Sequence, residues 1–290
     1  MVNRLVAAFA LSALVFVPAG AQVGSTAVQS ISPVYEGWEQ NPDGSFTLLF
    51  GYFNRNWEEV DVPIGPNNKI EPGNLEQGQP THFFPRRTRY LFSIRVPKDF
   101  GKQEVIWTLT VNGKSERAYA TLKPDYFTDS MIIQANNGEG SVQGGDTKNQ
   151  PPAVSVEGEQ TRHVKVGVPV PLTAIATDDG VPKPRPGPPS PIPPRTRIVP
   201  TSATGLRLSW SVYRGAGKVA FDPPQFESWE DERDGHDSPH APGWVTPQAP
   251  PDGKWIVRAT FGEPGTYVLR ALAHDGGLFA SKDITFVVSR

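Results

Sequence analysis

The chain has 290 residues, a formal net charge of −2 at pH 7 and no cysteine. This length is enough for two domains, because cores of roughly 100 to 150 residues are the commonest. The lack of cysteine excludes disulfides, thiolate metal sites, a cysteine nucleophile and an acyl chain on an N-terminal cysteine, so we expect apolar cores to hold the domains. The near-neutral charge gives no electrostatic footprint for nucleic acid or anionic membranes.

Residues 1–21 have the order of a secretory signal peptide. Arg4 precedes an apolar run from Leu5 to Val17, and the small residues Ala19-Gly20-Ala21 follow, so cleavage is expected after Ala21. The run is shorter than the roughly 20 apolar residues that a membrane-spanning helix needs. We expect an exported protein, periplasmic or extracellular, with a leader at 22–30 and no membrane span after cleavage.

Residues 31–128, domain one, are predicted to form an antiparallel β domain. The runs at 90–96 and 105–111 alternate apolar and polar residues at period two, as half-buried strands require. Asp43-Gly44 and Asn112-Gly113 lie between β-rich runs, and both dipeptides favour hairpin turns. One long irregular loop, from Pro63 to Pro80, interrupts the domain.

Residues 129–149 lose this periodicity and gather Gly, Asn and Asp, which predicts a flexible linker. Residues 150–290, domain two, contain short strands separated by turn signals, as a β-sandwich does. Two insertions interrupt them: a proline-dense loop at 181–195, expected to be stiff and extended, and an acidic loop at 227–244, expected to be solvated. The predicted fold class is all-β, with two antiparallel β-sandwich domains joined by a flexible linker after a signal peptide.

Four features of domain two carry a resemblance: "NQPPAVSV", "ATDDGVP", Trp210 and "EPGTYVLRALAHDGG". They resemble the immunoglobulin-like and PKD-like extracellular repeats of bacterial secreted proteins. The resemblance implies that Tyr267 stands near the start of the penultimate strand, with Leu269 and other aliphatic residues replacing the core disulfide. Where PKD repeats usually have a Gly-Asp-Gly turn after the Trp, this chain has "WSVYRGAG".

Domain one contains "YEGWEQNPDGSFTLLFGYFNRNWEE" and "PTHFFPRRTRYLFSIRVPKDFG". These stretches resemble an uncharacterised domain of bacterial exported proteins. The resemblance implies an exported context and no particular chemistry.

Acid and glycine end two apolar stretches of domain two, "AIATDDG" and "ALAHDGG". In an immunoglobulin-like topology these two strands end at the same pole, so Asp178, Asp179 and Asp275 would lie on neighbouring loops. Carboxylates from two loops are oxygen ligands of the kind that Ca²⁺ prefers. The alternative is that Asp-Gly only forms the turns. A structural calcium ion is the one cofactor that the sequence suggests.

Domain one is also dense in aromatic residues. Exposed rings stack on sugars while arginines bind hydroxyls or carboxylates; the alternative is that the rings fill a small β core. The candidate ligand-binding residues are Phe53, Trp57, Phe83, Phe84, Arg86 and Arg87.

The sequence contains none of the common hydrolase, metalloprotease, P-loop or dinucleotide motifs. A glycosidase-type pair needs only two acids at a fixed separation, and Glu36, Glu39, Glu58, Glu59 and Asp61 are the candidates. We therefore predict an exported, non-catalytic binding or cell-envelope interaction protein of unknown ligand, whose partner is an envelope protein or a glycan. The alternatives are a carbohydrate-binding protein that uses domain one, and a hydrolase with an unrecognised carboxylate pair.

Overall fold

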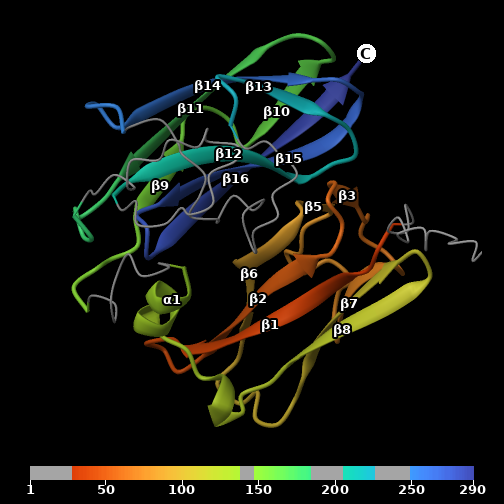
Figure 1. The fold of residues 1–290 in the computed structure, drawn as a ribbon, viewed down its shortest axis with the longest axis vertical. Coiled ribbons are helices and arrows are strands. Elements are labelled where there is room, and N and C mark those ends of the chain that lie inside the picture. Colours follow the sequence, from red (N-terminus) through yellow and green to blue (C-terminus); the bar gives the residue numbers. More distant parts are fainter. Residues whose placement is uncertain (1–27, 138–146, 184–204, 226–248) are drawn as a thin grey trace, which may run out of the picture.

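The computed structural model describes residues 28–137, 147–183, 205–225 and 249–290 (Figure 1). The predicted signal peptide, most of the leader, the acidic loop and all but the start of the proline-dense loop lie outside the described residues. Strands make up nearly all the regular structure of the described ranges, which confirms the all-β class. No helix in these ranges is long and apolar enough to cross a membrane.

Domain one consists of two three-stranded sheets and a short strand pair. The first sheet has the order β1-β2-β6, from β1 (Ile31–Gln40), β2 (Phe46–Asn54) and β6 (Arg86–Val96). The second has the order β4-β7-β8, from β4 (Asn68–Glu71), β7 (Val105–Val111) and β8 (Lys114–Ala120). The pair is β3 (Val60–Asp61) with β5 (His82–Phe83). Both predicted hairpin turns are confirmed, since β1 pairs with β2 and β7 with β8.

Trp107 on β7 holds the two sheets of domain one together. Its ring meets Phe92 of the first sheet edge-on, with centroids 5.0 Å apart, and its indole Nε1 donates to Asn68 Oδ1 at 3.0 Å. The buried Asn68 amide donates in turn to the carbonyls of Val62 and Pro80, at 2.9 and 2.7 Å. These bonds tie both ends of the predicted irregular loop to the core, and the loop itself contains β4.

Domain two is a sandwich of two four-stranded sheets. One sheet has the order β13-β14-β11-β9, from β9 (Ala153–Val156), β11 (Val170–Thr177), β13 (Val219–Asp222) and β14 (Lys254–Phe261). The other has the order β10-β16-β15-β12, from β10 (Thr161–Lys165), β12 (Arg207–Arg214), β15 (Gly265–His274) and β16 (Phe279–Ser289). Strand β10 runs parallel to β16, so the prediction of purely antiparallel sheets is wrong at this edge.

This strand order is the immunoglobulin-like arrangement. That fold has its first, second, fourth and fifth strands in one sheet and its third, sixth and seventh strands in the other. Here β9, β11, β13 and β14 form the first set, and β12, β15 and β16 form the second. Strand β10 adds a short strand to the second sheet. Trp210 is buried on β12, the third-strand position, and Leu269 is buried on β15. The Tyr267 hydroxyl donates to the carbonyl of Glu263 at 3.0 Å, which is the tyrosine corner of this fold.

The segment predicted as a flexible linker begins with a helix, α1 (Ser130–Asn137). Asp129 caps the helix, since its Oδ1 accepts the Ile132 N–H at 2.9 Å, as N-terminal capping residues do. Ile133 packs against Leu49 and Tyr90 of domain one and Leu278 of domain two. The prediction of flexibility is therefore wrong for this part of the linker, because α1 lies packed between the domains (Figure 1). Residues 138–146 lie outside the described ranges.

Replacing Tyr267 by Phe tests the tyrosine corner. The substitution removes the hydroxyl that also lies 3.0 Å from the Ala216 carbonyl oxygen, so both carbonyls lose a partner. We expect the free energy of unfolding to fall by about 1 to 2 kcal/mol, measured by urea denaturation. Tyr119→Phe, at an exposed position on β8, should leave the midpoint unchanged, and equal midpoints for the two variants would contradict the assignment.

Candidate functional site

The predicted sugar-binding rings do not form one exposed row. Phe83 is fully buried in the core of domain one, and Phe84 is buried beneath domain two. Phe83 meets Tyr52 edge-on, with centroids 5.0 Å apart. Phe53 is half-buried on β2, and of the four only Trp57 is exposed, at 43%. Of the four predicted aromatic residues, Phe83 and Phe84 are thus buried, as the alternative of a core role predicts.

The two predicted arginines have separate roles. The Arg86 guanidinium lies 3.2 Å from the centroid of the Trp57 ring. Arg87 instead approaches both carboxylate oxygens of Glu36, at 2.6 and 2.7 Å. A Cβ at Gly51 would collide with Glu36 and with the Thr88 carbonyl, so the glycine makes room for this ion pair. The six predicted ligand-binding residues therefore do not form one site, because some lie in the core, one forms an ion pair and others lie at the surface.

The candidate acids of domain one are also engaged. Asp61 lies 2.8 Å from His82 Nδ1, and Glu59 lies 3.3 Å from His82 Nε2. Burial alone would lower the pKa of His82, but the hydrogen bonds and charges of these two carboxylates outweigh it and raise that pKa to about 9. Glu36 is paired with Arg87. Three of the five predicted acids are therefore paired, two with the buried His82 and one with the half-buried Arg87.

The acids of domain two act first as turn formers. Asp275 Oδ1 accepts the N–H groups of Gly277 and Leu278, at 2.5 and 2.7 Å, and Asp178 accepts the Gly180 N–H at 2.9 Å. Asp179 uses both oxygens on the N–H groups of Gln150 and Val181. Short polar side chains that bond their own backbone in this way stabilise turns.

The charge of Asp178 interacts with those of both Asp179 and Asp275. Burial raises the pKa of Asp275 to about 6, and the charge of Asp178 adds to that rise. The Arg207 guanidinium interacts with Asp275 as well, so a protein cation already stands there. Among the described residues no group of three or more His, Asp or Glu is placed to hold a metal ion. Calcium binding stays a prediction, without the three-carboxylate site on which it was based.

The largest functional feature that the sequence analysis missed is the contact between the domains. Four hydrogen bonds join residues 78–81 of domain one to residues 213–215 at the end of β12. The Thr81 N–H donates to the Tyr213 carbonyl at 3.2 Å, and the Gly215 N–H donates to Thr81 Oγ1 at 3.1 Å. Arg214 Nε donates to the Gln79 carbonyl at 2.9 Å, and the Tyr213 hydroxyl donates to the Gly78 carbonyl. The end of the predicted irregular loop therefore covers the edge of β12.

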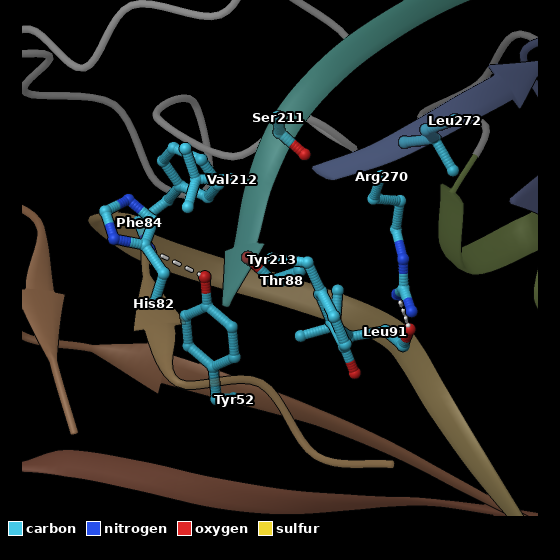
Figure 2. Close-up of a pocket in the computed structure, with 10 residues that line it drawn as sticks. All are labelled: Tyr52, His82, Phe84, Thr88, Leu91, Ser211, Val212, Tyr213, Arg270 and Leu272. Carbon is cyan, nitrogen blue, oxygen red and sulfur yellow. Dashed lines mark hydrogen bonds between the residues drawn. The ribbon is translucent and has the colours of Figure 1, made fainter. Parts of the chain in front are cut away.

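Arg270 on β15 is the second contact between the domains. Its guanidinium makes two bonds to Asp283 on β16, at 2.7 and 2.8 Å, and a third to the Leu91 carbonyl of domain one at 2.6 Å (Figure 2). Its central carbon lies 3.5 Å from the centroid of the Tyr213 ring. Bidentate pairing and stacking suit arginine specifically. The side chain is only 10% exposed, so this cation is enclosed between the two domains.

The cavity at this interface is lined from both domains, by Tyr52, His82, Phe84, Thr88, Leu91, Ser211, Val212, Tyr213, Arg270 and Leu272 (Figure 2). Its volume is ≈ 10 Å³, which is about the space of one water molecule. The cavity is too small for an organic ligand, and the interface is a packed joint.

Two exposed rings, Tyr126 and Phe127, lie beside the half-buried Tyr35 and Trp38 at the other end of domain one. We call the rings of Tyr35, Trp38, Tyr126 and Phe127 the aromatic end. Tyr126 and Phe127 are 46% and 47% exposed, next to the 3₁₀ turn η1 (Pro124–Tyr126). Tyr126 lies 5.2 Å from Tyr35, and Phe127 lies 5.2 Å from Trp38, between ring centroids. Figure 1 places η1, in yellow-green, at the edge of domain one remote from domain two. The sequence feature that could have predicted this exposure is Pro124-Asp125, directly before the adjacent rings of Tyr126 and Phe127. A turn at Pro124-Asp125 ends the alternation of a strand, which would otherwise bury one of the two rings.

No family model and no curated protein matches the sequence. Among solved structures, a chimeric titin Z1Z2 functionalized with a peptide from decorin has a TM-score of 0.25 at 10% identity, over 90% of this chain and 99% of that one. Sidekick-1 immunoglobulin domains 1–4 give 0.25 at 10%, over 91% and 51%. A protein of unknown function from Porphyromonas gingivalis W83 gives 0.23 at 8%, over 90% and 99%. Similarity this low carries no argument, so the immunoglobulin-like assignment depends on strand order and the tyrosine corner.

Replacing Arg270 by Ala tests the joint between the domains. The substitution leaves the Leu91 carbonyl without its donor and removes the bidentate pair with the partly exposed Asp283, so we expect the free energy of unfolding to fall by about 2 kcal/mol. Arg258→Ala, which removes an exposed ion pair with Asp222, should cost less than about 1 kcal/mol. Chemical denaturation measures both, and similar losses would show that Arg270 has no special role.

The His82 site predicts a pH dependence of stability. Because the pKa of His82 is about 9 in the folded protein against an ordinary 6.5, protonation favours the folded state. This contribution, about 3 kcal/mol at most, is complete below pH 6.5 and is lost as the pH rises to 9. The gap in unfolding free energy between wild type and His82→Gln should shrink over that window. A gap that stays constant would refute the prediction; His163→Gln, at an exposed position on β10, is the control.

Proposed function

We infer that the chain is an exported, non-catalytic binding module that contacts a partner in the cell envelope. Export is expected from the signal-peptide order of residues 1–21. The observation that carries binding is the aromatic end, where two adjacent rings are nearly half exposed. Exposed apolar surface of this kind, bordered by polar residues, is typical of interaction sites.

The joint between the domains supports the same proposal. A binding surface loses less entropy on association when its scaffold is already ordered. Arg270, Tyr213 and Thr81 connect domain two to domain one through bonds to backbone groups. Domain two thus stabilises the body that presents the aromatic end, and an immunoglobulin-like sandwich suits such a structural role.

Carbohydrate binding is the second candidate, and Trp57 favours it. This ring is 43% exposed on domain one and has Arg86 beside it, a combination able to stack on a sugar and bind its hydroxyls. The other predicted rings, Phe83 and Phe84, are buried, so a glycan site would be small. The hydrolase alternative is weaker, because Glu36, Glu59 and Asp61 already pair with Arg87 and His82.

Affinity capture with residues 22–290 tests the two candidates together. The wild type, Tyr126→Ser/Phe127→Ser, Trp57→Ser and the control Ile256→Ser, an exposed residue of domain two, are compared on envelope extract and on a glycan array. We expect one envelope protein to be lost with the double variant and retained with the other two. Glycan binding lost only with Trp57→Ser would support the alternative, and retention of every partner by the double variant would refute the proposal.

A further inference from the structure

The turns that follow β11 and β15 meet at one end of domain two. Alternate residues of both strands fill the core of the sandwich, and Asp178 and Asp275 come next in these two inward-facing series, since side chains of a strand alternate between its faces. Because the two strands belong to opposite sheets, their carboxylates approach each other at the end of the core. The charge of Asp178 accordingly raises the pKa of Asp275.

A third polar side chain, that of Asn149, reaches the same place from the segment before β9. Its Nδ2 donates to Gln134 Oε1 of α1 at 3.1 Å, and a Cβ at Gly277 would lie 3.2 Å from this nitrogen. The side chain also forms a hydrogen bond with Asp275. Asn149 is 3% exposed, so it is enclosed between α1 and the turn that follows β15.

Each of these three side chains has one buried oxygen atom that accepts no hydrogen bond within the described part of the chain. The three atoms are Asn149 Oδ1, Asp178 Oδ1 and Asp275 Oδ2. The second oxygen of each carboxylate accepts N–H groups of its own turn. Buried acceptors are normally paired with a donor, a water molecule or an ion. All three atoms are acceptors, so they cannot satisfy one another, and a positive charge among them would satisfy all three.

The nearby cation Arg207 does not supply this charge at close range. Leu208 and Trp210 of β12 fill the sandwich core, so Arg207 lies on the opposite face of the sheet, where its Nη2 is 3.5 Å from Nδ1 of His274. Arg207 and Asp275 form no ion pair within 4.0 Å, although the charges interact. One positive charge therefore faces two carboxylates from a distance, and the cluster keeps a net negative charge.

We propose that Asn149 Oδ1, Asp178 Oδ1 and Asp275 Oδ2 bind a calcium ion. Carboxylate and amide oxygens are ligands that Ca²⁺ prefers, and backbone carbonyls and water complete its six to eight positions. Asp178 is half-buried, so the ion and its water enter from that side. Asp179 is not a ligand, because both of its oxygens accept backbone N–H groups. The ion joins the segment before β9 to the turns of both sheets, and this role is independent of partner binding by domain one.

The test titrates residues 22–290, stripped with EDTA and dialysed, with calcium chloride in a calorimeter at neutral pH. We expect one ion per chain with a dissociation constant of about 0.1 to 1 mM, the range of extracellular modules. The melting temperature should rise by about 5 °C in about 10 mM calcium, because the ion binds only the folded state. Magnesium chloride at the same concentration should give a much smaller shift, since Mg²⁺ needs octahedral geometry and gives up its water reluctantly.

Asp178→Asn is the decisive variant, because it keeps an acceptor for the Gly180 N–H and its new amide nitrogen can donate to Asp275 Oδ2. We expect its melting temperature in EDTA to equal or exceed that of wild type, and its calcium shift to be lost. Asp179→Asn, next in the chain, and Asp222→Asn, an exposed acid of domain two, are the controls and should keep the shift. No calcium binding by wild type, equal shifts with both metals, or a calcium shift retained in Asp178→Asn would overturn the proposal.

Discussion

The arrangement of this protein depends on one buried cation, the guanidinium of Arg270. It lies opposite Asp283 on the neighbouring strand, forms a bidentate ion pair with it, stacks on Tyr213 and donates to a backbone carbonyl of domain one. A buried charge without such partners would cost several kcal/mol. The cation therefore makes separation of the domains costly, because separation breaks its bond to Leu91.

The contact between the domains explains why strands β12 and β15 are buried on both faces. Strands β12 and β15 are buried at successive positions, not at alternate ones. Their inner side chains, such as Trp210, fill the sandwich core, and their outer ones, such as Tyr213 and Leu272, face domain one. A sheet covered on both faces no longer shows hydrophobic alternation. Helix α1 and residues 78–81 also contact both domains. The aromatic end therefore belongs to a body of two joined sandwiches.

Local sequence patterns predicted much of this fold. Turn dipeptides such as Asn112-Gly113 carry their own backbone preference, whereas the place of Tyr267 was implied by the resemblance to immunoglobulin-like repeats. The joint was not predictable in this way, because an arginine in a strand is usually solvent-facing, and Arg270 becomes buried only through a domain whose residues lie far away in sequence. Helix α1 was missed because its anchor is the single side chain of Ile133 in a polar segment. The candidate site was misplaced for a similar reason: composition identifies aromatic residues, but only the packing shows that Phe83 is buried and Phe127 is exposed.

The central claim is that the two sandwiches form one body, and a distance distribution between the domains tests it most directly. Because the chain has no cysteine, Lys102→Cys and Ala220→Cys, at exposed positions of domain one and domain two, can carry spin labels without background. Pulsed electron resonance should give a single narrow distribution for this protein and a broad one when Arg270→Ala is added. A broad distribution with Arg270 in place would contradict the account.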